Sequence, residues 1–156
     1  MENTLLVAKE LNELFKSEHG TDMDEMRMHK LMYFVQRESL MCNNDPLFSS
    51  KFQGWKYGPV LVDIRNEYLS GRMFRYVSGH LCNKSKDLIL SVYNRYKRLS
   101  SWTLSSLSHG EISWKQARKG LPSDVNGTVE LRLADMRLDA AWEQLRRKGH
   151  IYNKRK

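Results

Sequence analysis

The sequence predicts a single compact, mainly helical domain of about six helices, with one short pair of strands at most. Three observations lead to this fold class. Apolar residues recur at three- and four-residue spacing along most of the chain, as in amphipathic helices. Leu, Ile, Val and Phe make up about 24% of the 156 residues, which is enough for a packed core. No repeat or low-complexity linker divides the chain, and we therefore expect residues 1–156 to form one domain.

Two helices are expected in the first third of the chain. Apolar residues at helical spacing predict one helix over residues 4–17, and Gly20 follows its end. A second helix is expected over residues 25–41. Asp24 is a favoured N-cap residue for it, and the acidic Glu25 suits the positive end of the helix dipole.

Three aromatic residues surround two glycines in the segment KFQGWKYGPV, at residues 51–60. Gly58 and Pro59 predict the start of a third helix, because a proline at the first helical position gives up no hydrogen bond that the helix needs. Gly71 is expected to end this helix, and residues 73–77 are expected to form a short strand.

The second half of the chain is predicted to add further helices and a strand. The helices are expected from Asn83 or Ser85 to Tyr96, from Ser100 or Ser101 to His109, from Trp114 to Lys119, and from about Asp135 to Lys148. The apolar residues at helical spacing in the last helix are Leu138, Ala141, Trp142 and Leu145. Alternation of Val129, Leu131 and Leu133 predicts a brief strand after the Asn-Gly turn at residues 126–127.

Composition excludes several classes of protein. No stretch approaches the roughly 18 consecutive apolar residues of a membrane span, and the first ten residues lack the basic and apolar regions of a secretory signal. The two cysteines, Cys42 and Cys82, form no CxxC pair. We therefore expect a cytoplasmic protein with reduced thiols, no membrane contact and no structural zinc site.

We expect no catalytic, cofactor or metal site, and no enzymatic activity. Ser108, His109 and Glu111 are neighbours in a predicted turn, where a nucleophile, its base and an orienting group rarely meet. His109 and Glu111 are instead expected to tie this turn by hydrogen bonds. His80 and Cys82 complete no standard zinc pattern with His109, and the central glycines lack the G-x-x-x-x-G-K-[ST] pattern of a phosphate-binding loop.

The net charge of +8 is concentrated in the second half of the chain, with −3 over residues 1–71 and +11 over residues 72–156. This uneven distribution of charge favours an acidic partner. The partner is either an acidic protein or a nucleic acid, which would be bound without sequence preference. A solvated helix face with a frayed basic tail at residues 149–156 is the simpler alternative. The candidate partner-binding residues are Arg95, Lys97, Arg98, Lys115, Arg118 and Lys119, with Arg27 and Lys30 on the second helix.

Some of the basic and aromatic side chains are expected inside the protein rather than on a contact surface. For Lys30 we favour packing of the aliphatic stem under Trp55 or Tyr57, with the ammonium group on a carboxylate or a carbonyl. Trp55, Tyr57 and Trp114 are expected to belong to the core rather than to a contact surface, although large aromatic residues dominate both.

Four motifs follow one another in the middle of the chain. They are MDEMRMHKLMYFVQ at residues 23–36, PLF at 46–48, FQGWKYGPV at 52–60 and LSHGEISW at 107–114. In this order they resemble the SocA-like Panacea antitoxin domain family, also called a phage-associated domain, and the clearest match covers residues 5–120. Arg27 stands where the family usually has a first lysine, and Ser113 replaces a proline before Trp114.

The resemblance implies the antitoxin of a two-gene toxin–antitoxin system, which neutralises its cognate toxin by direct binding. Two alternatives stay open: an adaptor that delivers the toxin to a protease, and a basic protein that binds nucleic acid. Because little chain lies outside residues 5–148, we expect no separate DNA-binding domain. The motif residues, which we expect to be mainly structural, are Tyr33, Trp55, Tyr57, Gly58, Pro59, Val60, His109, Glu111 and Trp114.

Overall fold

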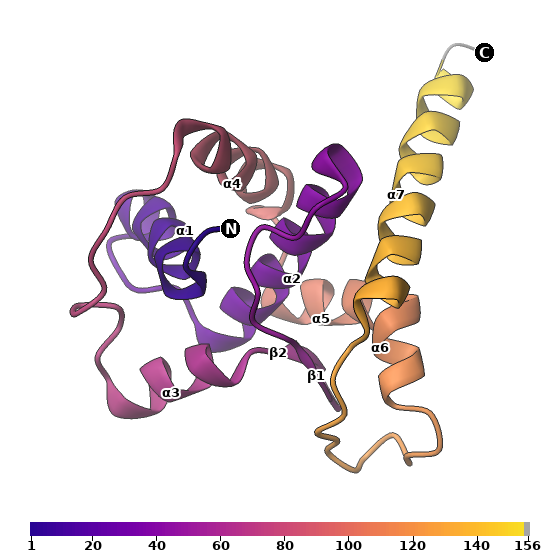
Figure 1. The fold of residues 1–156 in the computed structure, drawn as a ribbon, viewed down its shortest axis with the longest axis horizontal. Helices are drawn as coiled ribbons and strands as arrows, with labels where there is room; N and C mark the ends of the chain where they lie inside the picture. The colour runs from indigo at the N-terminus through magenta and orange to yellow at the C-terminus, as the bar shows by residue number, and fades with distance from the viewer. Residues whose placement is uncertain (155–156) are drawn as a thin grey trace.

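Helix α2 (Glu25–Asn43) lies at the centre of the molecule, and the other elements pack around it (Figure 1). The computed structural model describes residues 1–154, with side chains for residues 1–149. Within these residues the chain forms seven helices and one two-stranded antiparallel sheet, which confirms the mainly helical fold. The remaining elements are α1 (Thr4–His19), β1 (Gln53–Trp55), β2 (Gly58–Val60), α3 (Val62–Ser70), α4 (Asn83–Tyr96), α5 (Ser101–His109), α6 (Ile112–Ala117) and α7 (Leu133–Lys154).

The side chains of α2 are buried without a break from Met28 to Leu40. Helices α1, α3, α4, α5 and α7 and strand β2 all contact this helix. An amphipathic surface helix buries only its apolar side. Helix α2 is buried on all sides over this stretch, and its buried side chains therefore include polar ones such as Lys30 and Arg37. Because a buried polar group is costly without a hydrogen-bond partner, the surrounding elements must carry polar partners for these side chains.

The predicted starts of α1 and α2 are confirmed, and both helices have side-chain caps. Asn3 accepts hydrogen bonds from two backbone N–H groups in the first turn of α1, and Asp24 accepts one from the N–H of Arg27 at 3.0 Å. Gly20 follows α1 in the left-handed conformation, with a φ of 75°. Both helices continue slightly beyond their predicted ends.

The predicted helix start at Gly58 and Pro59 is wrong. These residues belong to β2, which pairs antiparallel with β1 and places Gly58 opposite Trp55. The φ of Gly58 is 121°, a conformation outside the helical region that glycine adopts readily and other residues do not. Helix α3 begins only at Val62 and ends, as predicted, before Gly71.

The strand predicted at residues 73–77 is also absent, and a turn takes its place. Met73 and Phe74 have φ values of 47° and 65°, which are incompatible with an extended strand. The backbone N–H of Phe74 donates to the carboxylate of Glu67 at 2.9 Å. The turn is therefore held by a side chain of α3.

The alternating segment at residues 129–133 forms less than the predicted strand. Glu130 makes one isolated antiparallel bridge with Gln53 of β1. Leu133 already belongs to α7, so this helix begins earlier than the predicted start at Asp135.

Helix α7 packs against α2 and α6, and its C-terminal end projects beyond the rest of the molecule (Figure 1). Its inward side buries Met136, Asp139 and Ala140. The predicted basic tail at residues 149–156 continues this helix as far as Lys154, and residues 155–156 lie outside the described residues. None of the helices described here has the length and apolar character needed to cross a membrane.

Candidate functional site

The sequence motifs meet in two polar clusters around α2. The lysine cluster consists of Lys30, Gly58, Pro59 and Ser108. The carboxylate cluster consists of Tyr33, Arg37, Glu111, Ser113 and Asp139. Both clusters join residues that are far apart in the sequence, and both are built largely from the residues that carry the motifs.

The lysine cluster packs a buried ammonium group against the β-hairpin. Lys30 is 2% exposed, and its Nζ donates to the carbonyl oxygen of Pro59 over 3.4 Å. A Cβ atom on residue 58 would lie 2.5 Å from Ser108 Oγ and 2.8 Å from Lys30 Nζ. Gly58 is therefore required both for its backbone conformation and for the space that the Lys30 and Ser108 side chains occupy.

Ser108 has the surroundings of a structural serine. Its side chain is fully buried, and its hydroxyl donates to the carbonyl of Ser105 at 2.7 Å within α5. The hydroxyl of Ser105 in turn donates to the carbonyl of Tyr57 in the hairpin turn. These contacts join α5 to the hairpin and use the Ser108 proton, so the serine is not arranged as an activated nucleophile.

Burial lowers the pKa of the Lys30 ammonium group to about 8, and the nearby Glu25 carboxylate opposes this shift only partly. The unfolded chain, in which Lys30 has an ordinary pKa near 10.5, therefore binds more protons than the folded chain between about pH 8 and 10.5. The free energy of unfolding should consequently rise with pH across this window, because the folded state no longer bears the cost of a buried charge.

We expect the Lys30→Met variant to lose this pH dependence. From pH 7.5 to 9.5 the Lys30 contribution to the free energy of unfolding should rise by about 2 kcal/mol in the original protein. Urea denaturation at both pH values measures the change, and Lys86→Met, at an exposed position of α4, is the matched control. An equal pH dependence in the original protein and the Lys30→Met variant would contradict the assignment.

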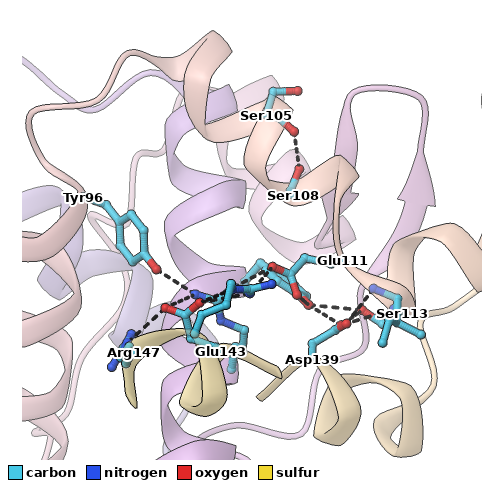
Figure 2. Close-up of polar contacts among 12 residues, drawn as sticks. Tyr96, Ser105, Ser108, Glu111, Ser113, Asp139, Glu143 and Arg147 are labelled. Carbon is cyan, nitrogen blue, oxygen red and sulfur yellow. Dashed lines mark hydrogen bonds and ion pairs between the residues drawn. The ribbon is translucent and has the colours of Figure 1, made fainter. Parts of the chain in front are cut away.

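The carboxylate cluster joins α2, α6 and α7, as Figure 2 shows. Glu111 accepts a hydrogen bond from the guanidinium of Arg37 at 2.6 Å. Asp139 accepts one from the Tyr33 hydroxyl at 2.6 Å and another from the Ser113 hydroxyl. All five side chains are buried, and α2 is thereby linked to the two C-terminal helices.

Asp139 also caps helix α6 from a distance. Its carboxylate accepts from the backbone N–H groups of Ile112 and Ser113, at 2.6 and 3.2 Å. Glu111, the residue in the N-cap position of α6, caps no N–H group with its own side chain because it is bound to Arg37 instead. Helix α6 thus begins where a carboxylate of α7 satisfies its free donors.

Ion pairs extend the cluster toward the surface along α7 (Figure 2). Arg147 contacts Glu38 of α2 at 2.9 Å and Glu143 at 3.0 Å. Arg37 lies 3.5 Å from Glu143 and donates to the hydroxyl of Tyr96 at 2.7 Å. Removing one partner from such a buried network typically costs about 3–5 kcal/mol, because it leaves a charge without compensation.

Burial and neighbouring charges shift the protonation of Glu111 and Tyr33. Burial raises the pKa of Glu111 to about 7, and the Asp139 charge adds to this while the Arg37 charge opposes it. Burial, with the charges of Glu111 and Asp139, holds the pKa of Tyr33 well above its usual value. Tyr33 therefore stays a hydrogen-bond donor at physiological pH.

His109 and Glu111 do not tie the turn between α5 and α6 in the way expected from the sequence. Glu111 bonds to α2 instead, through Arg37. The His109 ring stacks on Trp114 with 4.2 Å between the ring centroids and an interplanar angle of 8°. His109 Nε2 is buried without a hydrogen-bond partner, and burial lowers the pKa of this imidazole. The His109 ring thus packs on the first residues of α6 through Trp114.

The three motif aromatics differ in exposure. Trp55 and Trp114 are half-buried, and Trp114 Nε1 donates to the carbonyl of Trp55 at 2.8 Å. The core position predicted for Tyr57 is wrong, since this side chain is 48% exposed in the turn of the hairpin. It packs edge-to-face with the exposed Trp102, with 5.6 Å between the ring centroids.

Two of the candidate partner-binding cations are buried rather than exposed. Lys30 lies in the lysine cluster, and Arg118 is 7% exposed. The Arg118 guanidinium donates to the carbonyls of Gly54 and Pro122, both at 3.0 Å. It therefore holds the hairpin and the loop before α7 together. The buried position of Lys30 is the internal one favoured from the sequence, whereas the surface position expected for Arg118 is wrong.

The other candidate cations lie at least partly on the surface. Arg27 is half-buried and donates to the carbonyl of Leu99 at 2.7 Å, and Lys97 is half-buried and pairs with Glu18 at 3.4 Å. The exposed candidates are Arg95, Arg98, Lys115 and Lys119. Their engagement of a partner stays a prediction.

Sequence reasoning missed Arg37 and Asp139, which organise the carboxylate cluster. Both are charged residues within helices whose neighbouring positions are apolar or buried. A charged residue at such a position in a helix was the only signal in the sequence. The partners are distant along the chain: Arg37 and Glu111 are 74 residues apart, and Tyr33 and Asp139 are 106 residues apart. Across residues 1–149, no three His, Cys, Asp or Glu side chains are grouped to hold a metal ion.

The fold and the two clusters define a mainly helical domain whose motif residues fix the packing around the central helix α2. Residues 28–115, more than half of the chain, match the family described as Antitoxin SocA-like, Panacea domain. The chain therefore belongs to this antitoxin-like family, which confirms the resemblance found in the sequence. No curated protein and no solved structure matches the chain.

Proposed function

We propose that this protein is an antitoxin that neutralises a toxin protein by binding it directly. The family match over residues 28–115 supports this function, because a toxin is in general the partner of an antitoxin. The buried polar clusters are consistent with it, since their side chains are engaged in contacts within the chain. Binding is then a property of the surface that the scaffold presents.

The test is expression of the product of the neighbouring gene, alone and together with this protein. We expect growth to stop when the neighbouring product is expressed alone and to recover when both are present. The amount of that product, followed by immunoblotting, should stay constant during recovery, because direct binding blocks it without removing it. Its disappearance would instead support delivery to a protease, and growth inhibition that this protein does not relieve would overturn the function.

The exposed cations should accelerate encounter with an acidic face of the toxin. Changing Arg95, Lys115 and Lys119 together to glutamate should slow association several-fold and flatten its salt dependence, while dissociation stays nearly constant. Stopped-flow kinetics at two salt concentrations measure both rates. Each exposed pair contributes at most about 1 kcal/mol to affinity, so the effect should be mainly kinetic.

A matched control carries the same change in net charge elsewhere. Lys51, Lys84 and Lys86 are exposed, and their joint replacement by glutamate should leave the association rate closer to that of the original protein. An association rate that responds to neither salt nor the first triple substitution would contradict steering by these cations. Strong, salt-dependent binding of nucleic acid without any effect on the toxin would favour the alternative function.

A further inference from the structure

Helix α7 exposes a row of large apolar side chains on the side that faces away from the body. Leu138, Trp142 and Leu145 are 50%, 54% and 58% exposed. Their spacing of four and three residues places them in one row along the helix, with the exposed Ala141 beside them. The row spans about two helical turns, roughly 10 Å. Helical spacing of this kind is typical of a face that another element covers.

The acidic side chains of α7 lie against the body, together with the half-buried Arg137 and Arg147. The acidic residues Asp135, Asp139 and Glu143 are buried or half-buried against the body, where the last two join the carboxylate cluster and its ion pairs. The exposed charged residues of the segment 132–149 are Arg132, Arg146 and Lys148. The outward face of α7 therefore combines an apolar row with exposed basic residues, of which Arg146 also pairs with the half-buried Glu143 at 2.9 Å.

The borders of the row are basic. Arg146 follows Trp142 by one turn on one edge, and Lys148 follows Leu145 by one turn on the other. We propose that this face of α7 binds an amphipathic helix of the toxin, with an apolar row edged by Asp and Glu. The inference rests on the proposed function, and it names the surface and the chemistry of the contact.

Charge complementarity favours this occupant over the alternatives. A second copy of the chain would bring basic edges against basic edges, and Glu143 of α7 is already paired with Arg146 and Arg147 within the chain. An anionic membrane would accept the same cations, but the apolar row is short and the opposite side of the helix is fixed to the protein body. An acidic amphipathic helix satisfies both the row and its edges.

The first experiment measures binding of the neighbouring-gene toxin to variants of the full-length protein. Trp142→Ser combined with Leu145→Ser should weaken the Kd at least 100-fold, and Lys148→Glu should weaken it about tenfold. The matched controls are Leu69→Ser, at a 66% exposed position of α3, and Lys86→Glu on α4. Both controls should change the Kd less than twofold.

Because the substituted side chains are exposed, all four variants should keep the melting temperature of the original protein. Undiminished toxin binding by the Trp142→Ser, Leu145→Ser variant would overturn the proposed surface and leave the antitoxin function intact. A toxin that the original protein fails to bind would instead overturn the proposed function.

A second experiment tests the surface without the toxin. Fluorescence anisotropy compares two labelled synthetic helical peptides with the same leucine row, one edged by Glu and the other by Lys. The Glu-edged peptide should bind at least tenfold more tightly, and the double substitution at Trp142 and Leu145 should abolish the difference. Equal binding of both peptides would contradict the inference. It would also be contradicted if the original protein formed a dimer, or adsorbed to phosphatidylserine vesicles, and the double substitution abolished that association.

Discussion

Replacing Gly58 by alanine is expected to lower the free energy of unfolding by about 3–5 kcal/mol, a large part of the stability of a domain this size. Two costs combine. The φ of 121° is one that side chains bearing a Cβ rarely adopt. The new Cβ would also lie 2.5 Å from Ser108 Oγ and 2.8 Å from Lys30 Nζ, so the lysine cluster must open. Valine at this position should be worse still.

A second glycine separates the two costs. Gly79 has a similar φ of 129°, but an added Cβ would meet only the tip of the Leu6 side chain, at 3.0 Å. Gly79→Ala should therefore show mainly the backbone strain, about 1–3 kcal/mol. In the Gly58→Ala background, Ser108→Ala should recover part of the lost stability, because it removes the nearest atom. Urea denaturation measures all three variants.

The outcome also decides what the hairpin does. A Gly58→Ala protein that keeps its original melting temperature but no longer binds the toxin would show that residues 52–60 are an interface rather than a structural support. The same reasoning applies to Trp55→Ala, since Trp55 is half-buried and its carbonyl accepts from Trp114. We expect both variants to lose neutralisation through loss of the fold.

The starts of α1, α2 and α5 were predictable because their signals are local. Asp24 caps α2 through the N–H of Arg27, three residues away, and Ser100 caps α5 through the N–H of Thr103 in the same way. The Gly-Pro dipeptide was misleading, because a proline fits the start of a helix as well as a short strand at the edge of a sheet. The φ of Gly58 decides between them, and it depends on contacts with α2 and α5.

The candidate site could be predicted only in part, because its contacts are distant in the sequence. The motif residues Tyr33 and Glu111 were identified, but the hydrogen bond from Tyr33 to Asp139 depends on which side of α7 packs against the body. Helical spacing suggests that the apolar row with Trp142 faces the core. The carboxylate of Asp139 faces it instead, since it satisfies buried donors of α2 and α6 that no apolar side chain satisfies.

Replacing Asp139 by alanine should cost about 3–5 kcal/mol of stability, comparable to Gly58→Ala. The substitution removes the acceptor for the Tyr33 hydroxyl, the Ser113 hydroxyl and the first two backbone N–H groups of α6. Of these donors, the Tyr33 hydroxyl has a second acceptor nearby, Glu111 at 3.3 Å. Asp124→Ala, in the exposed loop before α7, is the matched control and should change stability by less than about 0.5 kcal/mol.

A double-mutant cycle with Tyr33→Phe tests whether the shared hydrogen bond carries part of this cost. If the Tyr33 hydroxyl and Asp139 act as one unit, the double variant should lose less stability than the sum of the two single variants, by about 0.5–3 kcal/mol. Asp139→Asn should fall between the aspartate and the alanine, because the amide keeps one acceptor oxygen but places a donor opposite the remaining N–H and O–H groups. Additive losses would show that the Tyr33–Asp139 hydrogen bond carries none of this cost. An Asp139→Ala protein as stable as the Asp124→Ala control would show that other contacts hold α7 to α2, among them the ion pair of Arg147 with Glu38.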